Sequence, residues 1–267
     1  MNLEKSIIEP DELQLYFGKP FYINPYIQVN SPTIGDLIDM GESNYFGVLH
    51  QLTAIPSDIK AKLWDDLHIY WTDISDFDFF CLMVQNLTPE ETGVFLGDLD
   101  FSSMNYGEHN QTKEHVLYKE LDDSYLIINE AIYQQIVKAL RFIHNIHPKK
   151  EKAVSDSMKK LLIDLNREDI AKASKESSGS TFKPLISSML NSEGFKYDIF
   201  SVRQVPYMAF IDSLGRIPAI KNAMAMLSGI YGGWVDTSKM DKEQLNWMRD
   251  LDKDKKKIEN MKLKQNP

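Results

Sequence analysis

The chain lacks the residues and segments that several protein classes require. It contains one cysteine, Cys81, among 267 residues, which excludes an internal disulfide framework and any zinc or iron–sulfur site built from several thiolates. The longest uncharged stretch of its C-terminal half, 222–235, falls short of the ~18–20 apolar residues of a membrane span. Acidic residues occupy the start, MNLEKSIIEP, where a signal peptide places its apolar core. We therefore expect an intracellular protein that does not cross a membrane.

Motifs for common catalytic chemistry are also missing. The sequence has no Gly-x-Ser-x-Gly elbow, no His-Glu-x-x-His helix and no set of kinase motifs. The segment SGST at 178–181 has neither the lysine nor the glycine spacing of a phosphate-binding loop. Cys81 lies within the apolar segment FDFFCLMVQNL, where we expect the thiol to pack as a small hydrophobic group. The sequence therefore predicts a non-enzymatic protein without cofactor or metal.

Two pairs of residues leave a metal-dependent hydrolase as an alternative. Asp98 and Asp100 form an Asp-x-Asp pair, and two such carboxylates can share a divalent cation. His144 and His147 lie three residues apart near the end of an expected helix and could ligate a metal together. Each pair also has a simpler interpretation, because aspartate is common in loops and histidine is favoured at helix C-termini.

Charge is distributed unevenly along the chain. The 39 acidic and 30 basic side chains give a net charge of −9. Residues 1–147 carry 23 acidic and 8 basic side chains, a net charge of −15, whereas residues 148–267 carry 16 acidic and 22 basic ones, a net charge of +6. This asymmetry predicts two halves that dock on each other or two surfaces with different partners, and solvated helix faces are the simpler alternative.

Nucleic-acid binding is not expected. The lysine-rich segment 252–267 holds three acidic residues beside its six lysines and no aromatic ring that could stack on a base. The net charge of the whole chain is negative, which repels a phosphate backbone.

Hydrophobic periodicity predicts a mainly α (α+β) protein with many helices. Aromatic and β-branched residues between positions 16 and 29, punctuated by Gly, Pro and Asn, predict a short N-terminal β element. Two apolar segments flanking Asp122-Asp123 predict a β-hairpin near 115–128, and 97–110 is expected to be a loop. Thr88-Pro89-Glu90-Glu91 predicts a helix start with a capping box. Further helices are expected at 33–41, 57–67, 76–87, 129–146, 154–165 and in several segments between 182 and 251.

These patterns predict four segments. The first is an acidic α+β domain at 1–147, and a helical connector and linker follows at 148–181. Polar residues at 172–181, KASKESSGST, mark the linker. A C-terminal helical domain at 182–251 and the lysine-rich tail at 252–267 complete the chain.

The C-terminal domain is rich in side chains that protein interfaces use. The whole chain has 12 methionines, 4 tryptophans and 12 tyrosines, and such side chains adapt to or anchor a partner. Core packing is the alternative role, and we expect it for Trp64 and Phe79. We predict that the protein-binding residues are Tyr207, Met208, Met224, Tyr231, Trp234 and Trp247.

Two stretches of the sequence resemble a group of uncharacterised bacteriophage proteins. The first runs from Ile27-Gln28-Val29 into PTIGDLIDMGE and continues through PSDIKAKLWDD and DISDFDFF. The second is TFKPLISSMLNSEGFKYDIFSVRQVPYMAFIDSLGRIPAIKNAMAMLSGIYGGWVD. The nearest named class is the tail assembly chaperones of long-tailed phages, helical proteins that hold the tape measure protein during tail building.

This resemblance implies a tail morphogenesis protein. Its partners would be phage tail proteins such as the tape measure protein, and its location would be the host cytoplasm. A structural component retained in the virion is the neighbouring interpretation, and an accessory protein that binds host components is another. A homo-oligomer of this chain is also compatible with a role in tail assembly.

Overall fold

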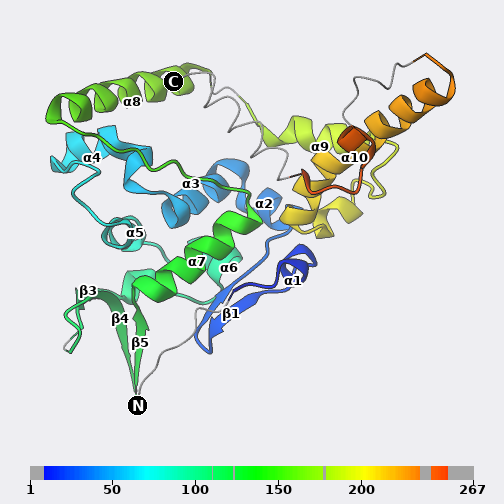
Figure 1. Cartoon of the computed structure of the whole chain (residues 1–267). Coiled ribbons are helices and arrows are strands. Elements are labelled where there is room, and N and C mark those ends of the chain that lie inside the picture. Colours follow the sequence, from blue (N-terminus) through cyan, green and yellow to red (C-terminus); the bar gives the residue numbers. More distant parts are fainter. Residues whose placement is uncertain (1–8, 110, 123, 177–178, 235–241, 252–267) are drawn as a thin grey trace. The chain divides into compact units, whose positions relative to one another are not determined.

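The computed structural model describes residues 9–109, 111–122, 124–176, 179–234 and 242–251. Helices dominate it, and two small antiparallel sheets accompany them (Figure 1). The predicted mainly α (α+β) class is therefore confirmed. The chain forms two compact units: the first unit comprises Met1–Thr181 and Val202–Met208, and the second unit comprises Phe182–Ser201 and Ala209–Pro267.

A short helix and a β-hairpin open the first unit. Helix α1, Glu12–Tyr16, begins after Asp11, whose carboxylate accepts hydrogen bonds from the backbone N–H groups of the first turn. Strands β1, Phe21–Asn24, and β2, Ile27–Val29, pair antiparallel and bury every second side chain. The predicted N-terminal β element is thus confirmed.

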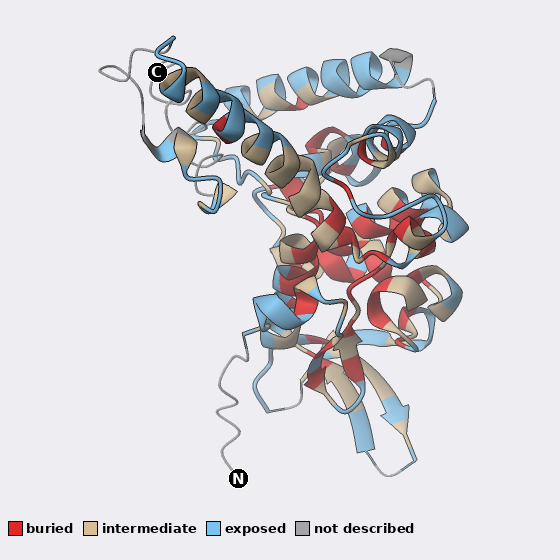
Figure 2. Ribbon diagram, turned by 90° about the vertical axis from the view of Figure 1, so that its right-hand side faces the viewer, coloured by how far each residue is buried: buried red, intermediate tan, exposed pale blue. Residues whose placement is uncertain are grey.

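Five helices and one 3₁₀ turn build most of the core of the first unit. Polar caps define two of their starts: Thr33 forms a capping box with Asp36, and Thr88 forms the predicted one with Glu91. Figure 2 shows the buried residues concentrated in the helices of this unit. The helices are α2 (Ile34–Met40), α3 (Glu42–Thr53), α4 (Lys60–Leu67), α5 (Asp76–Val84) and α6 (Pro89–Leu96), with the 3₁₀ turn at Pro56–Ile59.

The second sheet has the strand order β3-β4-β5. Strands β4, His115–Leu121, and β5, Ser124–Ile128, form the predicted hairpin in an unbroken register. Strand β3, Asn105–Glu108, pairs with β4, so the expectation of a loop over 97–110 is wrong at this strand. The segment NYGE has no apolar alternation, because its side chains are largely exposed. Its strand conformation comes from the hydrogen bonds to β4, which a local pattern does not reveal.

Helix α7, Glu130–Ile143, is an amphipathic helix that Asn129 caps. Its buried stripe includes Ile136, Leu140 and Ile143, as the spacing of apolar residues predicts. The helix was expected to end at Ile146, but it ends about one turn earlier, because His144 is the C-cap and Asn145 adopts a positive φ of 53°.

Helix α8, Asp156–Glu176, belongs to the first unit and packs against α4. Its buried anchor is Ile163, whereas the stripe Met158, Leu161 and Leu165 is exposed, and most of the helix is solvent-accessible (Figure 2). The segment 148–181, expected to be a connector between domains, is therefore part of the first unit. Ile163, the half-buried Leu162 and ion pairs hold it there, a combination that periodicity does not predict.

The second unit contains α9, Phe182–Leu190, and most of α10, Tyr207–Tyr231. Phe182, Phe195 and Phe210 form its aromatic core, with ring centroids 5.5 Å and 5.9 Å from that of Phe210. The sequence predicted several helical segments in this region, whereas α10 is one helix that continues through Pro218. A 3₁₀ turn at Lys242–Leu245 follows, and the tail 252–267 lies outside the described residues.

The segment Val202–Met208 departs from the expected domain 182–251 because it belongs to the first unit. The Ile34 N–H donates to the Val205 carbonyl at 2.9 Å, and the Tyr207 N–H donates to the Pro32 carbonyl at 2.7 Å. A single β-bridge joins Thr33 to Pro206. These backbone hydrogen bonds fix a distant stretch of sequence against the start of α2.

Candidate protein-binding surfaces

The second half of α10 presents an apolar stripe to solvent. Ile220, Met224, Leu227 and Tyr231 follow the i, i+4, i+7, i+11 spacing of one helix face. Met224 and Tyr231 are exposed, the latter at 86%, and the other two are half-buried. A helix of 25 residues with only three charged side chains normally lies inside a core or against a partner. This stripe therefore has the composition of an interface.

Two tryptophans of the second unit are also exposed. Trp234, which follows α10, is 90% exposed. Its backbone N–H donates to the Gly229 carbonyl at 2.9 Å. Trp247 is exposed as well, and the Arg216 guanidinium donates to its carbonyl at 2.8 Å. Both backbones are thus held in place while their rings face water.

Sequence reasoning missed a further exposed pair, Ile199 and Phe200, the latter 81% exposed. The Asp198 carboxylate accepts hydrogen bonds from the Ser201 N–H at 2.7 Å and the Phe200 N–H at 3.0 Å. These bonds lower the pKa of the Asp198 carboxyl and fix the turn that displays the two side chains. The spacing Asp-x-x-Ser around an apolar pair was the available signal, because it is typical of such turns.

The remaining predicted binding residues, Tyr207 and Met208, belong to the first unit. Tyr207 is only 6% exposed, and its ring lies 6.2 Å from Tyr45 and 4.8 Å from His144. It is therefore a core residue of this unit and corrects our expectation of an exposed contact. Met208 is half-buried. The β-bridge of Pro206 and the backbone hydrogen bonds of this segment direct the Tyr207 side chain inward. The apolar residues beside Tyr207 in the sequence did not indicate this orientation.

The Tyr45, His144 and Tyr207 side chains form a buried polar cluster. The Tyr45 hydroxyl lies 2.8 Å from His144 Nε2, and His144 Nδ1 lies 2.8 Å from the Leu140 carbonyl. Burial lowers the pKa of His144 to about 4 and raises the pKa of Tyr207 to about 12. Burial also raises the pKa of Tyr45. At neutral pH all three groups are uncharged, so the cluster is a hydrogen-bonded part of the core.

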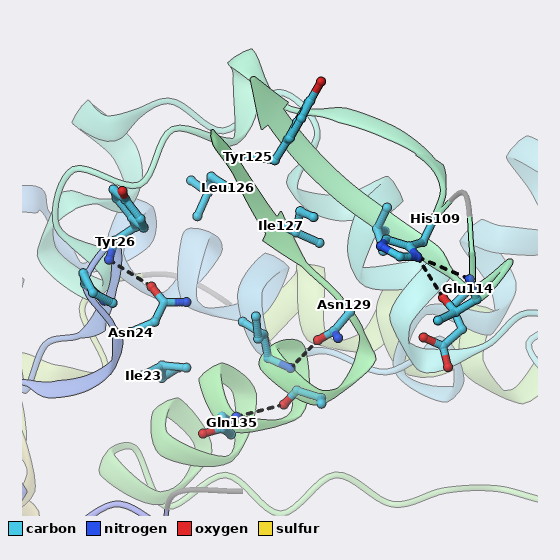
Figure 3. Close-up of a pocket in the computed structure, with 15 residues that line it drawn as sticks. Ile23, Asn24, Tyr26, His109, Glu114, Tyr125, Leu126, Ile127, Asn129 and Gln135 are labelled. Atoms are coloured by element: carbon cyan, nitrogen blue, oxygen red, sulfur yellow. Dashed lines mark hydrogen bonds between the residues drawn. The ribbon is translucent and has the colours of Figure 1, made fainter. Parts of the chain in front are cut away.

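A cavity of about 560 Å³ lies in the first unit beside strand β5 (Figure 3). The turn between β1 and β2 supplies Asn24 and Tyr26, and the loop between β3 and β4 supplies His109 and Glu114. In Figure 3 these two groups lie on opposite sides of β5. The first turns of α7, with Gln135, complete the wall.

Both apolar and polar residues line the cavity, and one of them is a carboxylate. Asn24 Oδ1 accepts from the Tyr26 N–H at 2.9 Å, and Asn129 Oδ1 accepts from the Ile132 N–H at 3.0 Å. Both amides are thereby oriented by the backbone. Among the described residues that line the cavity, Glu114 is the only carboxylate, and there is no lysine or arginine.

The aspartates of the hydrolase alternative have structural partners. Asp100 Oδ1 accepts from the Ser102 hydroxyl at 2.6 Å, and Lys119 Nζ lies 3.7 Å from its other oxygen. Hydrogen bonds from Ser102 and Ser103 lower the pKa of its carboxyl. Asp98 is exposed and lies on the loop after α6.

The two histidines of that alternative do not face one site. Both ring nitrogens of His144 lie within hydrogen-bond distance of core groups, whereas His147 is exposed beside Asn145. Within the described ranges no group of three or more His, Cys, Asp or Glu residues is arranged to hold a metal.

Cys81 is buried in α5, and burial raises the pKa of its thiol to about 12. The thiol thus stays protonated at neutral pH, as expected for a packing residue. No helix in the described part of the chain is both long and apolar enough to span a bilayer. Comparisons with protein-family models, curated proteins and solved structures give no match.

Proposed function

We propose that this chain is a non-enzymatic phage morphogenesis protein of the tail-assembly type, which binds other tail proteins in the host cytoplasm. The observation that carries the proposal is the exposed apolar surface of the second unit, defined by Met224, Tyr231, Trp234 and Trp247. Large side chains of this kind cost free energy in water and are typical of surfaces that a partner covers.

The mechanism is binding of apolar segments. A partner helix or extended segment covers the α10 stripe and the tryptophan rings, and burial of ~25 cal/mol per Å² of apolar surface drives the association. The flexible side chain of Met224 adapts to the shape of the partner, whereas the aromatic rings anchor the partner. The resemblance to tail assembly chaperones supports the tape measure protein as the partner.

Co-expression tests this function. The chain is produced with the tape measure protein of the same phage, and both co-purification and the soluble fraction of the tape measure protein are measured. We expect the wild-type chain to retain the partner in solution. The combined variant Met224→Ser, Tyr231→Ser, Trp234→Ser, Trp247→Ser should lose this effect.

The matched control changes exposed apolar residues of the first unit. Leu13→Ser with Phe17→Ser removes two side chains that are also exposed and should leave partner binding unchanged. Equal solubility of the tape measure protein with and without the chain would reject the proposal. Mass spectrometry of purified virions separates the alternative of a retained structural component, which would be present in stoichiometric amount.

A further inference from the structure

Strand β5 has an open edge. In the order β3-β4-β5, the described part of the chain pairs it only with β4. Within the described residues no backbone hydrogen bond outside helices and sheet ladders involves 124–128, and no side chain donates to or accepts from their backbone. In an antiparallel pair every second residue directs its N–H and C=O away from the partner strand. β5 therefore offers a row of unpaired backbone donors and acceptors.

The residues of β5 do not protect this edge. Natural edge strands commonly carry charges, proline or a bulge that prevents pairing with another chain. Strand β5 reads SYLII, without charge, glycine or proline, and its register with β4 is unbroken. The opposite edge strand, β3, contains Gly107 and Glu108 instead. The two edges of one sheet are thus unequal, and β5 is the one suited to pairing.

The 560 Å³ cavity reaches this open edge and extends to the paired side of the strand, where Val116 of β4 and Glu114 of the loop between β3 and β4 also line it. Three consecutive residues, Tyr125, Leu126 and Ile127, line it. Because successive side chains of a strand point to opposite faces, a cavity lined by all three reaches around the edge. Figure 3 shows lining side chains on both sides of the strand. Among the described residues, the cavity therefore leaves space beside the backbone groups of β5 that have no partner there.

The side chains on the two sides specify the chemistry of the occupant. Tyr26, Ile23 and Leu126 offer apolar surface, and Glu114 supplies the only carboxylate among the described residues of the lining. Residues 1–147 carry a net charge of −15, which attracts a basic partner.

We propose that β5 binds an extended, lysine- or arginine-containing segment of another protein, which adds to the sheet as a further strand. Its backbone pairs with β5, its apolar side chains contact Tyr26 and Leu126, and an alternate basic side chain faces Glu114. This mode of recognition takes affinity from main-chain hydrogen bonds and specificity from alternate side chains. It concerns the first unit and is independent of the apolar surface proposed to bind tail proteins.

The test uses the full chain and a set of blocked seven-residue peptides that alternate valine, leucine or tyrosine with lysine, threonine or glutamate. Fluorescence anisotropy measures affinity, and hydrogen exchange measures protection of the amides at 124–128. We expect the lysine members to bind best and to slow exchange of these amides about tenfold or more. Methylation of alternate backbone nitrogens of the peptide should abolish binding, since it removes the donors that pair with β5.

Matched variants locate the site. Tyr26→Ala and Tyr22→Ala both remove an exposed ring of the first hairpin, at 58% and 62% exposure, but only Tyr26 lines the cavity. Tyr26→Ala should weaken binding severalfold and Tyr22→Ala should not change it. Glu114→Gln should remove the preference for lysine over glutamate peptides.

Several results would overturn the proposal. They are absence of binding by every peptide, equal binding of the methylated peptides, or equal effects of the two tyrosine variants. Protection of 124–128 that rises with protein concentration alone would show that a second copy of the chain is the occupant. None of these results depends on the tape measure protein, so the failure of one proposal leaves the other standing.

Discussion

The Tyr45 hydroxyl lies 2.8 Å from Nε2 of His144, although 99 positions separate the two residues. The Leu140 carbonyl near Nδ1 can only accept a hydrogen bond, so Nδ1 carries the proton of the neutral ring. Nε2 consequently accepts from Tyr45, and one tautomer of His144 satisfies both neighbours. This pair joins the C-terminal end of α7 to α3 in the core of the first unit.

Stability should fall as the pH decreases from about 6.5 towards 4. Burial lowers the pKa of His144 from 6.5 to about 4, so within this window the unfolded chain binds a proton that the folded chain does not. The free energy of unfolding therefore decreases with decreasing pH, by on the order of 3 kcal/mol for this group.

Urea denaturation across this pH range checks the prediction. His144→Gln should flatten the pH dependence, whereas His50→Gln, which replaces an exposed histidine of α3, should leave it unchanged. An identical slope for His144→Gln and the wild-type chain would contradict the assignment.

Gly35→Ala should detach the Val202–Met208 segment from the first unit. A Cβ at Gly35 would lie 2.7 Å from the Arg203 carbonyl oxygen, a backbone atom that cannot move alone. We expect a loss of ~1–3 kcal/mol in unfolding free energy and faster hydrogen exchange at the Tyr207 amide. Gly47→Ala is the control, because no atom lies within 4 Å of its added Cβ in α3, and it should stabilise the helix by up to about 1 kcal/mol. Similar effects of both substitutions would argue against the steric explanation.

Local signals in the sequence predicted correctly those elements whose structure depends on a few neighbouring residues. Thr88 and Glu91 form their capping box, and the segments flanking Asp122 form a hairpin, because these interactions lie within a few residues. Strand β3 pairs with the neighbouring strand β4, but its own segment NYGE is largely exposed and shows no apolar alternation. The buried position of Tyr207 depends on a partner far along the chain, because Pro206 forms a β-bridge with Thr33. No local periodicity encodes such pairings, so the sequence indicated neither.

The candidate sites divide in the same way. Aromatic and methionine content predicted Met224, Tyr231, Trp234 and Trp247 as binding residues, and the structure shows these four side chains exposed. The open edge of β5 was not visible, since an edge is defined by the strands that a sheet lacks. The predicted hairpin at 115–128 contained the strand but not its position in the sheet.

The packing of α8 on α4 should be sensitive to salt. Arg167 pairs with Asp65, and Lys159 Nζ lies 3.4 Å from Asp73, so basic residues after position 147 contact acidic ones before it. Screening weakens such exposed pairs, whereas it does not weaken the apolar contacts of Ile163 and Leu162 with the core of the first unit. Raising NaCl from about 0.05 M to about 0.5 M should speed hydrogen exchange in α8 more than in the buried helix α7.

Two variants separate this interaction from a general effect of salt. Arg167→Gln should raise exchange in α8 already at low salt and reduce its salt dependence. Lys172→Gln is the matched control, because Lys172 pairs with Glu168 within α8 itself. Exchange in α8 that does not respond to salt would show that the apolar contacts of Ile163 and Leu162 hold the helix without the ion pairs.

Truncation of Phe210 should lower the unfolding free energy of the second unit, whereas truncation of Trp234 should leave it nearly unchanged. Phe210 is fully buried and packs against Phe182 and Phe195, so Phe210→Ala should cost about 3–5 kcal/mol through lost contacts and a cavity. Trp234→Ala removes a ring that is 90% exposed and should leave the unfolding free energy within ~0.5 kcal/mol of the wild-type value. Thermal denaturation followed by near-ultraviolet circular dichroism measures both. If Trp234→Ala destabilised the chain as much as Phe210→Ala, the ring would be part of the fold, and the apolar surface of the second unit would lose its strongest anchor for a partner.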